Sequence, residues 1–157
     1  MSLHVVSQQF SAGIAGGVGT SAVASIEIIN SSASKGLFIK EILCSLKAAT
    51  ATTLGVGRPA AAGITPTTPA LLLPLDGKSV GDAKTAIAWG TPPTVPAAFI
   101  ARISQQGVIG LTIDFVFADD GIYLAPGQTL VVWNLGTNSV IDATIDASEV
   151  SQVVTNP

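Results

Sequence analysis

Side chains suited to nucleophilic or acid–base catalysis are scarce, because the 157-residue chain has one histidine, His4, and one cysteine, Cys44. A Ser-His-Asp or Cys-His enzyme would have to use His4, close to the first residue. A cupin-type metal site needs two or three histidines with a carboxylate, so the ligand count excludes it. Cys44 alternates in phase with Ile42 and Leu46, which predicts a small buried hydrophobic side chain and not a reactive thiol.

Carboxylates are the remaining groups with catalytic chemistry. A glycosidase-like pair could be drawn from seven aspartates and three glutamates, but no spacing in the sequence brings two of them together. The glutamates are Glu27, Glu41 and Glu149. Asp119 and Asp120, with Asp114, could bind calcium, yet Asp-Asp-Gly between two strands is far more typical of a turn.

Two other patterns could bind ligands. The glycine-rich stretch 13–19 resembles a phosphate-binding loop, but it contains no lysine and does not lie in a βαβ unit. Trp89, Trp133 and Tyr123 could stack on sugars or bases, although aromatic residues make up only 5% of the chain and more often anchor a core or an interface. The sequence therefore predicts no catalytic residue, no metal site and no cofactor.

Composition limits the class of protein. Hydrophobic residues are 48% and charged residues only 11% of the chain, and the mean hydropathy of +0.58 is high for a soluble monomer. Gly, Pro, Ser and Thr interrupt every apolar run before it reaches the length of a membrane span. The excess apolar surface is therefore expected to meet other protein subunits. A net charge of −3 without a basic cluster argues against binding to nucleic acid.

Alternating apolar and polar residues predict a single all-β domain. Residues 140–147 alternate cleanly, and residues 129–135 are apolar on both faces, which places that strand between two layers. Seven of the nine prolines lie between residues 55 and 96, so most of that stretch should be loop or edge. The other expected strands are 21–30, 37–47, 71–75, 85–89, 98–104, 111–117 and 122–124.

The predicted fold is an antiparallel β-sandwich, with a jelly roll as the expected topology. Residues 1–20 are predicted to form an extended, glycine-rich N-terminal arm, residues 21–150 the sandwich, and residues 151–157 a C-terminal tail. The N-terminus lacks the basic residues and apolar core of an export signal, so synthesis in the cytoplasm is expected.

Three segments of this sequence, residues 55–77, 81–104 and 121–139, resemble a widespread type of small virion protein of tailed bacteriophages. The matching residues are Trp89 and Pro93, then Arg102, then the run 124–128 with Trp133 and Asn134. The resemblance covers roughly residues 20–150 and implies a β-sandwich structural protein of the capsid or its appendages.

Low charge and strands that are apolar on both faces suit a subunit of a symmetric assembly. The leading hypothesis is a capsid decoration (cement) protein, a trimer that binds the major capsid protein on the surface of the virion, with no enzymatic activity and no membrane partner. The alternatives are a receptor- or carbohydrate-binding head of a fibre, or a tail or neck component. The candidate interface residues are Val5, Phe10, Ile14, Val18, Trp89 and Trp133.

Overall fold

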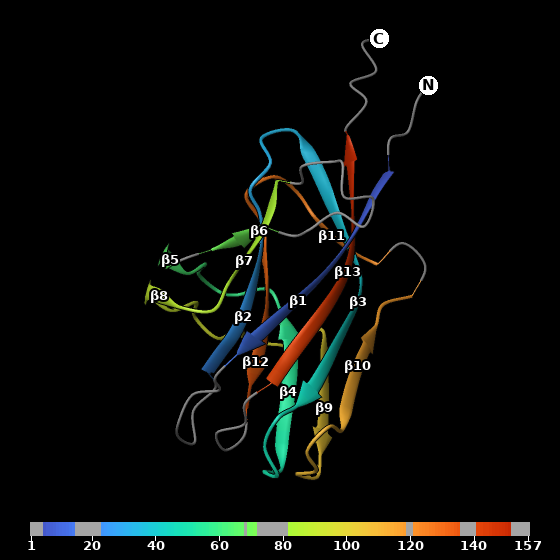
Figure 1. Ribbon diagram of the computed structural model, residues 1–157. Coiled ribbons are helices and arrows are strands. Elements are labelled where there is room, and N and C mark those ends of the chain that lie inside the picture. The colour runs from blue at the N-terminus through green and yellow to red at the C-terminus, as the bar shows by residue number, and fades with distance from the viewer. Residues whose placement is uncertain are drawn as a thin grey trace.

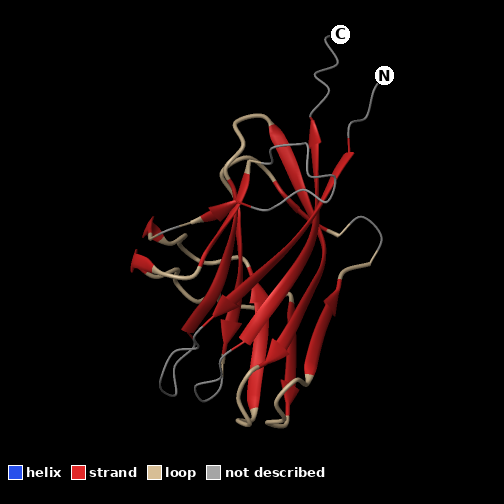
Figure 2. Cartoon of the chain, in the orientation of Figure 1, coloured by secondary structure: helices blue, strands red, loops and turns tan. Residues whose placement is uncertain are grey.

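The computed structural model describes residues 5–14, 23–67, 69–71, 82–118, 121–135 and 141–151. All regular structure in these residues is β-strand, and every strand pairing is antiparallel (Figures 1 and 2). Two sheets pack face to face with their apolar sides together. The all-β sandwich predicted from the sequence is confirmed.

Sheet A is built around its longest strand, β3, which pairs with β13 on one side and with β10 and β11 on the other. The strand order is β1-β13-β3-β10, with β11 beside the first half of β3. The bounds are β1 (Val5–Ile14), β3 (Lys35–Leu46), β10 (Thr112–Val116), β11 (Ile122–Leu124) and β13 (Ile141–Ser151).

Sheet B has the order β6-β7-β2-β12-β4-β9, and its central strands are the most apolar. A separate two-stranded sheet, β5 with β8, stands to one side of the sandwich (Figure 1). The bounds are β2 (Val23–Asn30), β4 (Thr52–Gly57), β5 (Ile64–Pro66), β6 (Ala70–Leu71), β7 (Ala83–Ala86), β8 (Trp89–Thr91), β9 (Ala101–Gln105) and β12 (Thr129–Asn134).

The core between the sheets follows the period-two pattern of the strands. In β13, Ile141, Ala143 and Ile145 are buried while the intervening residues are partly exposed, as the sequence predicts. They pack in one cluster with Ile28 of β2 and Val132 of β12 from sheet B. Each such buried aliphatic side chain stabilises the fold by about 1.5 to 3 kcal/mol.

The segment Ala125-Pro126-Gly127-Gln128 makes the predicted tight turn before β12. Gly127 has a φ of 78°, which is the left-handed conformation that glycine adopts most readily, and the Gln128 amide donates to the Ala125 carbonyl at 3.0 Å. The Gly127 amide in turn donates to the Asn30 carbonyl at 2.8 Å, which fixes the turn against the end of β2.

The first described strand, β1, lies within the predicted N-terminal arm. Residues 5–14 pair along β13 without a register shift, from Val5–Val150 to Ile14–Ile141. The physical reason is that the β13 edge would otherwise present unpaired backbone amides and carbonyls, which this strand satisfies. The rest of the predicted arm, residues 1–4 and 15–20, and the predicted tail beyond Ser151 lie outside the described residues.

Candidate functional site

A projecting ribbon is the most distinctive surface feature of the described chain. It consists of residues 59–67 and 87–100, which we call the proline ribbon. Its two halves pair at Ile64–Thr91 and Pro66–Trp89, and a further bridge joins Ala61 to Thr94. Its first half follows β4, and its second half connects β7 to β9. Trp89 and Phe99 of the second half pack on the outer face of sheet B.

The ribbon turns the outer face of sheet B into a second small core. Trp133, Val131 and Ala24 of the sheet are buried there against Trp89 and Phe99 of the ribbon, with Leu135 alongside. This arrangement explains why β12 is apolar on both faces, because each face is covered by a different layer.

Glycines in β4 let the ribbon approach closely. A Cβ atom at Gly55 would lie 2.8 Å from Phe99 Cδ1, and one at Gly57 would lie 3.1 Å from Pro96 Cγ. Side chains at these positions would push the ribbon away from the sheet.

Glu27 holds the ribbon from below. Its side chain is fully buried on β2, where Oε2 accepts a 2.6 Å hydrogen bond from Trp89 Nε1 and Oε1 accepts a 3.1 Å bond from the Gly63 amide. We call these three residues the ribbon latch. Within the described ranges no lysine or arginine forms an ion pair with Glu27, so two neutral donors satisfy this buried carboxylate.

A second buried carboxylate, Glu149 of β13, joins the two sheets. Glu149 Oε1 accepts bonds from the backbone amides of Asp82 (2.7 Å) and Ala83 (3.0 Å), and Oε2 lies 3.4 Å from Lys35 Nζ. Lys35 also pairs with the Asp82 carboxylate at 3.2 Å. The hydrogen bond to Asp82, together with the negative charge of Glu149, raises the Lys35 pKa above 10.5, although burial opposes the rise. We call this cluster the rim clamp.

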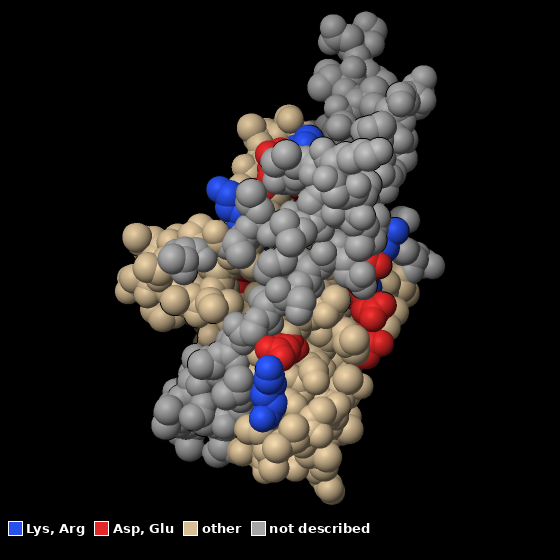
Figure 3. All heavy atoms as spheres, viewed as in Figure 1, with Lys and Arg blue, Asp and Glu red and all other residues tan. Residues whose placement is uncertain are grey.

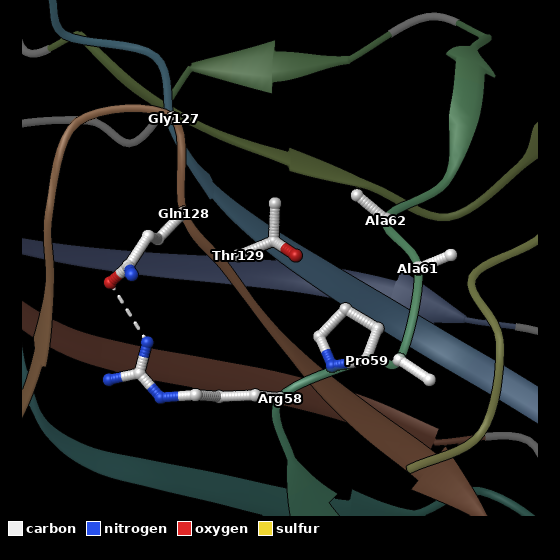
Figure 4. Close-up of a pocket in the computed structure, with 8 residues that line it drawn as sticks. Arg58, Pro59, Ala61, Ala62, Gly127, Gln128 and Thr129 are labelled. Carbon is white, nitrogen blue, oxygen red and sulfur yellow. Dashed lines mark hydrogen bonds between the residues drawn. The ribbon is translucent and has the colours of Figure 1, made fainter.

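A shallow depression of about 230 Å³ lies where the ribbon begins, beside the turn that precedes β12 (Figure 4). Arg58 reaches across it and donates to Gln128 Oε1 at 2.9 Å and to the Tyr123 carbonyl at 2.6 Å. Gln128 Oε1 also accepts from the Ala125 amide at 3.0 Å. Arg58 therefore stabilises the turn that precedes β12. The rest of the lining is proline, alanine, glycine and threonine, which do not form a catalytic group arrangement.

The groups that the sequence offered for chemistry are held apart. Cys44 is buried, and burial followed by the nearby charge of Asp114 raises its pKa to about 12, so the thiol stays protonated. Glu27 and Glu149 lie on different sheets with separate partners. In the part of the chain that the structure describes, no three His, Cys, Asp or Glu side chains gather as a metal site. His4, Asp119 and Asp120 lie outside the described residues.

The predicted interface residues fall into three groups. Val5, Phe10 and Ile14 are in β1, where they pair with Val150, Ile145 and Ile141, and Val18 lies outside the described residues. Trp89 is half-buried in the ribbon latch. Trp133 is only 1% exposed because the ribbon covers it, so its side chain is part of the subunit's own core and unavailable to a partner.

The ribbon latch and the rim clamp are the two polar clusters that sequence reasoning missed. The only signal in the sequence was a glutamate in a predicted strand, Glu27 between Ile26 and Ile28, and nothing near it indicated Trp89 as its partner. No described helix is long and apolar enough to cross a bilayer.

Comparison with known proteins adds nothing to what the residues of the chain show. No protein-family model and no curated protein sequence matches the chain. Among solved structures, the chain is similar to the decameric BFDV capsid protein, with 7% sequence identity and a TM-score of 0.30, covering 96% of this chain and 99% of that one. Such values carry no argument about function, so the proposals below rest on the residues of this chain.

Proposed function

We propose that this chain is a structural protein of a tailed-bacteriophage virion, a decoration or cement protein that trimerises and binds the major capsid protein to stabilise the head. The observation that supports this most directly is the proline ribbon, an exposed apolar projection that hydrogen bonds to the buried Glu27 carboxylate fix to the sandwich. Such a subunit is suited to making contacts and has no need of a reactive site.

Its mechanism would be mechanical. Apolar surface buried between subunits contributes about 25 cal/mol per Å², and several weak contacts made by one oligomer add through avidity. A trimer that contacts adjacent capsomers would in this way oppose their separation under the pressure of packaged DNA. The β1 strand, which carries Val5, Phe10 and Ile14, is at the edge of sheet A and would be the place where a strand of the capsid protein adds.

The alternative function as a receptor- or carbohydrate-binding fibre head needs an aromatic platform open to ligand. Trp89 is the candidate, but its indole N–H is bonded to buried Glu27 and its ring packs in the second core. The structure offers no observation that favours this function. A tail or neck component would share the same subunit design, and the experiment below separates it from a head protein.

The test uses heads of the phage that encodes this chain, purified from a deletion mutant. Added wild-type protein should bind saturably to the heads, in multiples of three per site, and should raise the temperature at which DNA is released. Tails purified from the same mutant are the matched control and should bind none. Binding to tails alone, or to neither, would overturn the proposal.

A further inference from the structure

We draw no further inference here: the strongest candidate, the exposed apolar surface of the proline ribbon, the uncharged projection in Figure 3, carries nothing because no contact among the described residues shows what covers it.

Discussion

Glu27 and Glu149 are both buried carboxylates on inner strands, but they are stabilised by different kinds of partner. Glu149 receives two backbone amides and the ammonium group of Lys35. Glu27 receives an indole and one amide, both uncharged. The rim clamp joins the two sheets, whereas the ribbon latch fastens an added layer to one of them.

The difference separates the stability of the fold from the stability of its interaction surface. Loss of the rim clamp removes a connection between elements that share the main core, so the whole sandwich should be affected. Loss of the ribbon latch loosens a projection whose own core is small, so the effect should be local.

The largest effect is expected for Glu149→Ala, which leaves two amides and the Lys35 ammonium group without this partner. It should lower the free energy of unfolding by about 3 kcal/mol, measured by urea denaturation. The control is Asp142→Ala, which breaks the 2.8 Å pair with Lys47 at a site where both side chains are well exposed and should cost about 1 kcal/mol or less. Similar losses in the two variants would show that the rim clamp is not special.

Glu27→Gln should cost about 2 kcal/mol, because the amide oxygen accepts from one donor while the NH₂ group is turned towards the other. Hydrogen exchange should be faster at Gly63, Thr67 and Thr94 in the ribbon and unchanged in β3. Uniformly faster exchange throughout the chain would contradict a local role.

Trp89→Phe keeps an aromatic ring in the second core but removes the indole N–H, and about 1 kcal/mol should be lost. In combination with Glu27→Gln, the second substitution should cost less than it does in the wild type, because both act on one hydrogen bond. Additive losses in urea denaturation would mean that the two side chains do not act together.

The smallest effect concerns pH. Since the folded state raises the Lys35 pKa, protonated Lys35 stabilises the fold fully below its ordinary pKa of 10.5, and this contribution disappears as pH rises through the raised value. Lys35→Met should therefore remove part of the loss of stability above pH 10.5 and leave the ribbon unaffected. The comparison is made by thermal unfolding of both proteins across that range, and parallel curves would disprove it.

Local patterns predicted most of the sandwich. Alternation in β10 and β13 identified strands whose inward residues are buried, and the two apolar faces of β12 predicted a strand between two layers. These strands can be predicted from the sequence because each pattern depends only on residues a few positions apart.

The ribbon layer depended on contacts that no local pattern encodes. Glu27 is a charged residue in a predicted strand, yet it is fully buried because a segment much later in the chain covers it. The proline-rich stretch was expected to be loop or edge, and Trp89 to end a strand begun at residue 85. Instead, β7 ends at Ala86 and Trp89 opens β8, which places its indole over Glu27.

The pairing of β1 with β13 also determines how the subunit unfolds under mechanical tension. Val5 lies opposite Val150, so the start of one strand is beside the end of the other. Tension applied between the two chain ends would act across the ladder and separate its residue pairs in succession towards Ile14 and Ile141. In a subunit held by both chain ends, the hydrogen bonds between β1 and β13 would break one pair at a time. In a subunit held through its ribbon and sheet faces, the force would be distributed over the packed core.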